Sequence, residues 1–183
     1  GDCHYLTGHI QAERKITLVR RLLDALGTGK QRLLLDWVSA GEGQRFSVLI
    51  TQFVNQIRDM GPFPLNDETE GKLRAIQSSL EGEKIRWMVG KAPELMEKEN
   101  VYGEQVDQER IREVMENTLH DELTKNRILV LLETGPQAAK EVSAKLKLSL
   151  PDTLPYLVSL VGEGRIGFDP TEESHYPRYV RSA

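Results

Sequence analysis

The residues in this chain with the clearest capacity for chemistry stand in the run Gly1-Asp2-Cys3-His4-Tyr5. Cys3 is the only cysteine among 183 residues, and His4 follows it directly. Thiolate and imidazole are both metal ligands, but a structural zinc site or an iron–sulfur cluster needs about four ligands. One cysteine therefore excludes an internal disulfide and a self-contained cysteine-ligated metal site. Judged by residue type alone, a lone cysteine is most often a small buried hydrophobic side chain.

The other residues that could do chemistry are scattered. His9, His120 and His175 lack cysteine or carboxylate neighbours at ligand spacing, which favours packing or surface roles over metal binding. No set of serine, histidine and acid indicates a hydrolase. Residues 25–30, Ala-Leu-Gly-Thr-Gly-Lys, resemble the end of a phosphate-binding loop. They lack the required glycine spacing and the hydroxyl residue after the lysine, and they follow a predicted helix rather than a strand, so we reject this motif.

The composition is typical of a soluble globular protein, with 39% hydrophobic and 28% charged residues and a formal net charge of −4. Nucleic-acid-binding domains usually carry a surplus of basic residues, which this chain lacks. No apolar run approaches the roughly 20 residues of a membrane helix, and no signal peptide is visible. We therefore expect a cytoplasmic protein with no membrane insertion and no nucleic-acid partner.

The first third of the chain predicts a helix, a strand and a second helix. Apolar residues recur at helical spacing through residues 10–26, and the apolar run Leu33–Val38 is typical of a buried strand in a parallel sheet. Ser39 and Glu42 have the spacing of a capping box, and a second apolar stripe runs from there to Met60. Residues 1–62 are thus predicted to be an α/β fragment, a helix-strand-helix piece of a small parallel-sheet domain. Because one strand is not a sheet, this piece should be completed by a missing segment or by another chain.

The remainder divides into two parts. Residues 63–121 predict a charged helical connector, broken at Pro93 and at the turn over 100–103. Residues 122–183 predict three helices followed by a hairpin, which is a winged-helix-like α+β domain. The third helix, over 149–163, should be capped by Ser149 and carries no basic residue, so the pattern favours a protein-docking or structural role over DNA reading.

A family resemblance rests on two longer runs, GDCHYLTGHIQAERKITLVRRLL at residues 1–23 and RLLLDWVSAGEGQRFSVLITQFVNQIRDMGP at residues 32–62. Their most telling features are the Gly-Asp-Cys-His-Tyr motif, Arg14, and the stretch Trp37-Val38-Ser39-Ala40 followed by Glu42 and Phe46. These runs resemble the C-terminal half of the delta subunit of methyl-viologen-reducing hydrogenase.

The resemblance implies an electron-transfer subunit, with no catalytic residues of its own, that carries a cysteine-ligated two-iron two-sulfur (2Fe-2S) cluster. Its implied partners are a flavin-containing and iron–sulfur protein resembling the A subunit of heterodisulfide reductase, and a hydrogenase, formate dehydrogenase, NADH-oxidising or benzoyl-CoA reductase module. Such assemblies perform flavin-based electron bifurcation. Cys3 is the one residue carried over, as a candidate cluster ligand and metal ligand.

The chain also departs from the family pattern. Family members have an upstream half with further cysteines, so the remaining ligands are expected outside this segment. The absent half and the glycine at position 1 lead us to expect a truncated polypeptide, and a selenocysteine codon read as a stop is one hypothesis for its origin.

Two functions follow as hypotheses. The first is an iron–sulfur electron-transfer subunit of an anaerobic multi-subunit oxidoreductase, in which residues 122–183 dock the protein against its neighbours. The second is a winged-helix DNA-binding regulator that uses Cys3 as a redox-sensing thiol. A purely structural scaffold remains a third possibility.

Overall fold

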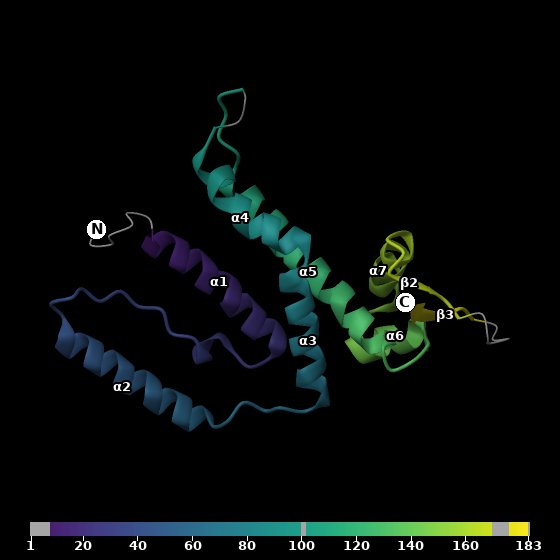
Figure 1. The fold of residues 1–183 in the computed structure, drawn as a ribbon, viewed down its shortest axis with the longest axis horizontal. Helices are drawn as coiled ribbons and strands as arrows, with labels where there is room; N and C mark the ends of the chain where they lie inside the picture. Colours follow the sequence, from purple (N-terminus) through teal and green to yellow (C-terminus); the bar gives the residue numbers. More distant parts are fainter. Residues whose placement is uncertain (1–7, 100–101, 170–175, 183) are drawn as a thin grey trace. The chain divides into compact units, whose positions relative to one another are not determined.

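The computed structural model describes residues 8–99, 102–169 and 176–182, and helices dominate it (Figure 1). The chain separates into two compact units, residues 1–69 and residues 70–183, and each is described by itself. No helix in the described ranges is both long and apolar enough to cross a membrane.

The first unit contains two long helices, α1 (Gly8–Leu26) and α2 (Gly43–Met60), with a short 3-10 helix, η1 (Lys30–Arg32), between them. Both long helices coincide with the predicted apolar stripes. Helix α1 ends where Gly27 adopts a positive φ of 81°, a conformation that glycine adopts without steric cost.

The predicted fold class for residues 1–62 is wrong, because the part of the chain that the structure describes contains no parallel sheet. Leu33 is extended, with φ −130° and ψ 118°, but residues 33–38 form no strand, and no strand among the described residues pairs with them. The physical reason is that a strand exists only through hydrogen bonds to a neighbouring strand, and a local apolar run cannot supply that neighbour.

The second unit begins with three helices, α3 (Asp67–Glu81), α4 (Glu83–Glu97) and α5 (Gln108–Leu132). The predicted break at position 93 is wrong, since α4 runs through it, and the actual break between α3 and α4 lies at Gly82. Helix α5 is continuous across the predicted boundary between residues 121 and 122. The division at residues 62 and 121 stays a prediction.

The end of the second unit is a small helix–sheet assembly. It comprises β1 (Gln137–Ala138), α6 (Ala139–Leu146), α7 (Leu150–Gly162), β2 (Ile166–Phe168) and β3 (Arg178–Arg181). The strands form an antiparallel sheet in the order β1-β3-β2, in which Gln137 pairs with Tyr179 and Gly167 pairs with Val180. The whole described chain is therefore mostly helical with one small antiparallel sheet.

The helix caps agree with the sequence in one case and differ in another. The Ser149 side chain accepts a hydrogen bond from the Asp152 backbone N–H at 3.2 Å, which confirms the predicted cap of α7. Residues 134–137, Thr-Gly-Pro-Gln, have the pattern of a turn with a capping box, which predicts a helix start there, but the N-cap of α6 is Ala138. Helix α6 is instead capped by Glu141, whose carboxylate accepts from the Ala138 N–H at 2.7 Å, and the Thr134 hydroxyl donates to the Leu131 carbonyl.

The hydrophobic core of the second unit lies where the end of α5 meets α6, α7 and the sheet. Burying such side chains removes about 25 cal/mol of unfavourable hydration free energy per Å² of apolar surface. Its buried members are Ile128, Leu129, Leu132, Val142, Leu146, Leu157, Leu160, Ile166 and Tyr179.

A buried polar network joins α5 to α3 and to the loop after α7. Asn126, 3% exposed, donates to the Ser79 hydroxyl oxygen and to the Glu122 carbonyl, both at 2.9 Å. Its own carbonyl oxygen accepts from the Arg165 guanidinium at 2.9 Å. Ser79, 1% exposed, donates to the Ala75 carbonyl at 2.8 Å. The buried Asn126 and Ser79 side chains thus have hydrogen-bond partners, one of which is the partly exposed Arg165, and this is the condition under which burial of polar atoms is tolerated.

Two ion pairs flank this network. Lys84 of α4 donates to the Glu122 carboxylate at 2.7 Å, and this hydrogen bond raises the pKa of Lys84. Lys125 donates to Glu163, the residue after α7, at 2.5 Å. Glu122 and Lys125 are both buried. Truncating either side chain would leave the charge of its ion-pair partner, Lys84 or Glu163, without its counter-ion.

We predict that Asn126→Ala lowers the free energy of unfolding by about 2 kcal/mol, because Ser79 and Arg165 each lose a buried partner. The matched control is Asn117→Ala on the exposed face of the same helix, which should change stability by less than about 0.5 kcal/mol. Chemical denaturation followed by circular dichroism measures both. Equal effects of the two substitutions would contradict a stabilising role for the network.

Candidate functional site

The structure gives no geometry for Cys3 or His4, which lie outside the described residues. The nearest described candidate is His9 in α1. Its ring meets the Trp37 ring edge to face, with centroids 5.9 Å apart and planes at 89°. The His9 Nδ1 is buried and has no hydrogen-bond partner in the structure. These contacts fit a packing histidine, as the sequence predicts.

A complete iron–sulfur cluster does not fit the residues of this chain. No three His, Cys, Asp or Glu residues in the described ranges are placed to hold a metal ion. The full sequence supplies a single thiol, Cys3, whereas a 2Fe-2S cluster takes four protein ligands. The chain could therefore supply one cysteine to a cluster whose other ligands are not among its residues.

The segment between α1 and α2 is attached to both ends of α2. At the C-terminal end, the Arg32 guanidinium donates to the Gly61 carbonyl at 2.9 Å, where the helix leaves carbonyl groups unpaired. At the N-terminal end, the Glu42 carboxylate accepts from the Ser39 backbone N–H at 2.9 Å and hydroxyl at 3.2 Å. These bonds, the backbone one first, lower the pKa of Glu42. The predicted pairing of Ser39 with Glu42 is present, although α2 starts at Gly43.

Helix α2 presents an apolar face that the described chain does not cover. Phe46, Ile50 and Val54 recur every four residues and are 56%, 42% and 39% exposed, and no residue of α2 is buried. An exposed apolar stripe on an amphipathic helix is typical of a surface that packs against another element. The described residues of the first unit thus include an uncovered apolar stripe that is a candidate docking surface.

A polar hollow lies between α5 and α7. The Tyr156 hydroxyl donates to the Asp121 carboxylate at 2.8 Å, and His120, Lys125 and Asp152 also line the hollow. Burial, followed by the hydrogen bond to Asp121, raises the pKa of Tyr156 to about 12. The phenol is therefore neutral near pH 7 and acts as a hydrogen-bond donor to Asp121.

The exposed side of α7 does not resemble a DNA-reading helix. Leu154 and Val158 are 39% and 69% exposed, and residues 150–162 include no Lys, Arg, Asn or Gln. Reading of base edges depends on those polar side chains. This surface is apolar instead, which disfavours the DNA-binding hypothesis and is compatible with protein contact.

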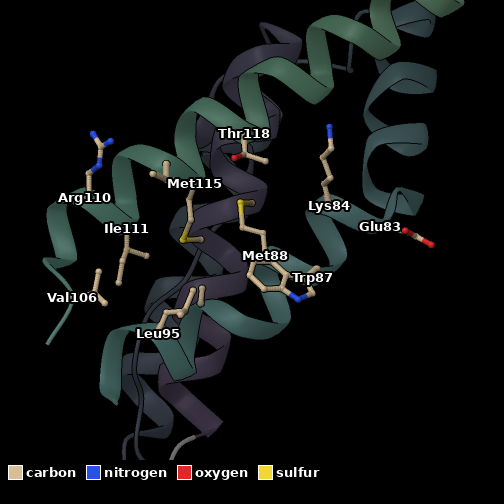
Figure 2. A pocket seen from close by; sticks show the side chains of 12 residues that line it. Glu83, Lys84, Trp87, Met88, Leu95, Val106, Arg110, Ile111, Met115 and Thr118 are labelled. Atoms are coloured by element: carbon tan, nitrogen blue, oxygen red, sulfur yellow. The ribbon is translucent and has the colours of Figure 1, made fainter. Parts of the chain in front are cut away.

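A groove lies between α4 and α5 (Figure 2). The sequence predicted only a helical connector in this segment and did not predict the groove. The groove encloses about 560 Å³ and is lined mainly by apolar side chains from both helices. The signal was present in the sequence as Trp87, Met88 and Leu95 at helical spacing. Such a stripe does not by itself distinguish a core face from an open groove.

Comparison with known proteins places residues 1–61 within the family described as methyl-viologen-reducing hydrogenase, delta subunit. One relative, the iron-sulfur D subunit of the F420-non-reducing hydrogenase of Archaeoglobus profundus, is 43% identical over 63 residues, which cover 34% of this chain and 46% of that protein. Another, the iron-sulfur D subunit of the F420-non-reducing hydrogenase vhc of Methanococcus voltae, is 37% identical over 73 residues, 40% of this chain and 50% of that protein.

A third relative is of a different kind. The A subunit of the ferredoxin:CoB-CoM heterodisulfide reductase of Methanosarcina mazei is 36% identical over 61 residues, 33% of this chain but only 8% of that protein. The chain spans about half the length of the hydrogenase D subunits that it matches, and no solved structure matches it. Residues 1–61 are thus a methyl-viologen-reducing hydrogenase delta-subunit domain, related to the iron–sulfur D subunits of hydrogenases and to the A subunit of heterodisulfide reductase.

Proposed function

We propose that this chain belongs to an iron–sulfur electron-transfer subunit of a cytoplasmic, anaerobic multi-subunit oxidoreductase. In this proposal it relays electrons between a partner oxidoreductase and a flavin-containing protein that resembles the A subunit of heterodisulfide reductase. It performs no substrate chemistry of its own. The observation that carries the proposal is the match of residues 1–61 to the delta-subunit family, together with hydrogenase relatives that are named iron-sulfur subunits.

The choice of a heterodisulfide-reductase-like partner rests on the Methanosarcina mazei relative. In that protein the delta-type segment matches 8% of a single polypeptide named as the A subunit of a heterodisulfide reductase. A segment that occurs within the same polypeptide in one organism is expected to work beside the corresponding protein in another. The donor side is proposed to be a hydrogenase, formate dehydrogenase, NADH-oxidising or benzoyl-CoA reductase module, and electron bifurcation is proposed for the assembled complex.

Cys3 is proposed to be the one ligand that this chain contributes to a 2Fe-2S cluster. The protein environment of such a cluster sets its reduction potential through hydrogen bonds and burial. The exposed Phe46, Ile50 and Val54 of α2 are proposed to pack against a neighbouring element of the complex. The remaining cysteine ligands would come from outside these 183 residues.

We predict that Cys3→Ala, which removes the ligand atom altogether, lowers the iron content of the native complex, purified anaerobically through a tag on this protein, by about two atoms per complex. Thr7→Ser, a conservative change four residues away, should leave the iron content unchanged. Iron and acid-labile sulfide analysis, with electron paramagnetic resonance after dithionite reduction, provides the measurement. An intact complex with undiminished iron would show that Cys3 is not a ligand.

The C-terminal helix–sheet assembly is proposed to dock this protein onto a partner subunit of the complex. Removing residues 122–183 would cut through α5, so a surface substitution is the cleaner test. Val158→Glu places a charge on the exposed apolar side of α7 and should reduce recovery of the partner by several-fold, with the iron retained in the complex that remains. The control is Ser78→Glu, an exposed position in α3.

Two results would count against this docking proposal or in favour of the DNA-binding hypothesis. Co-purification that is insensitive to Val158→Glu would argue against docking through α7. Binding of the purified chain to duplex DNA that weakens steeply with salt would support the regulator hypothesis instead.

A further inference from the structure

The groove between α4 and α5 is an apolar surface with an open side. Met88, Ala92 and Ile111 form its floor and are 8%, 6% and 8% exposed. Trp87 and Val114 stand along its sides and are 62% and 50% exposed. Figure 2 shows Met88 and Met115 facing each other across it from the two helices. Two helices with such a seam cover only part of their apolar surface, and a further helical layer would bury the rest.

The charges at the two ends of the groove are opposite. Glu83 lies at the start of α4, and Arg110 lies at the start of α5. The two helices run antiparallel, since Lys84 at the start of α4 bonds to Glu122, far along α5. Glu83 and Arg110 therefore mark opposite ends, as Figure 2 shows. The positive charge of Lys84, which also lines the groove, is balanced by the Glu122 carboxylate in an ion pair.

This arrangement of opposite charges at the two ends makes the groove complementary to a second copy of itself. A twofold axis perpendicular to the helices, through the middle of the groove, would lay the Glu83 end of one copy on the Arg110 end of the other. Both reciprocal ion pairs would form at once, and the exposed Trp87 of each copy would enter the groove of its partner. Isologous contacts of this kind are the commonest in homodimers. Arg110 already pairs with Glu113 at 2.9 Å, but that exposed pair is worth little and can exchange partners.

We propose that the groove between α4 and α5 binds a second copy of this chain, so that two helix pairs form an antiparallel four-helix layer with Trp87 at its centre. Helix α4 is 15 residues long, which corresponds to about 22 Å of contact length. Two neighbouring helices, each about 10 Å wide, would offer roughly 450 Å² of contact face over that length. This area lies below the roughly 800 Å² per partner of standard complexes, so the dimer is expected in the micromolar affinity range. This proposal rests on the second unit alone and does not depend on the electron-transfer function.

The first test is sedimentation velocity of the full 183-residue chain over a concentration series from about 1 to 500 μM. The chain should pass from monomer to dimer, and Trp87→Glu should raise the dimer Kd by at least about 30-fold, because a central tryptophan is the typical hot spot of an interface. Arg86→Glu, at the neighbouring exposed position outside the groove lining, is the matched control and should leave the Kd within about twofold of the parent.

The second test identifies the twofold arrangement. Glu83→Arg and Arg110→Glu should each raise the Kd by about 3- to 10-fold, since each places like charges opposite one another, and the double variant should restore the parent value. Circular dichroism of each variant checks that the helices remain folded. A chain that stays monomeric throughout the series, or a dimer that is insensitive to Trp87→Glu, would overturn the proposal. Failure of the double variant to recover would overturn the twofold pairing.

Discussion

The arrangement of the second unit depends on the side chain of Asn126. Apolar packing is non-directional and would let neighbouring helices slide, whereas a buried amide is satisfied only when donors and acceptors stand at hydrogen-bond distance and angle. Asn126 bonds to Ser79 of α3 and to Arg165 just after α7, and so fixes both elements against the C-terminal part of α5. Displacing either would leave a buried polar group without its partner, at a cost of about 1 to 3 kcal/mol.

This central attachment determines where apolar surface stays exposed. Helix α4 follows α3 after the single residue Gly82, and the ion pair from Lys84 to Glu122 holds its start beside α5. From there α4 runs along the N-terminal half of α5, while the main core gathers at the opposite end. The α4 and α5 pair thus closes on one side only, and its open side becomes the groove that contains Trp87.

The features that the sequence predicted are those governed by local geometry. Helical spacing of apolar residues located α1, α2 and α7, and the cap at Ser149 needs only a hydroxyl three residues before an N–H. The errors concern partners distant in sequence. The apolar run at 33–38 looked like a strand, yet pairing depends on a neighbour that the run does not specify. Strand β1 has only two residues and exists because β3, some 40 residues later, pairs with it.

The candidate site follows the same division. The family resemblance, not residue type, marked Cys3 as a candidate ligand, but a ligand set is a property of several residues in space, and one thiol cannot define it. The exposed apolar stripe of α2 is incomplete in the same sense, because Phe46 and Ile50 are half exposed with no covering element among the described residues. An unfilled ligand set and an uncovered helix face have one physical solution in common. Under the proposed function, contact with neighbouring polypeptide would complete both, as is expected of an electron-transfer protein that works within a complex.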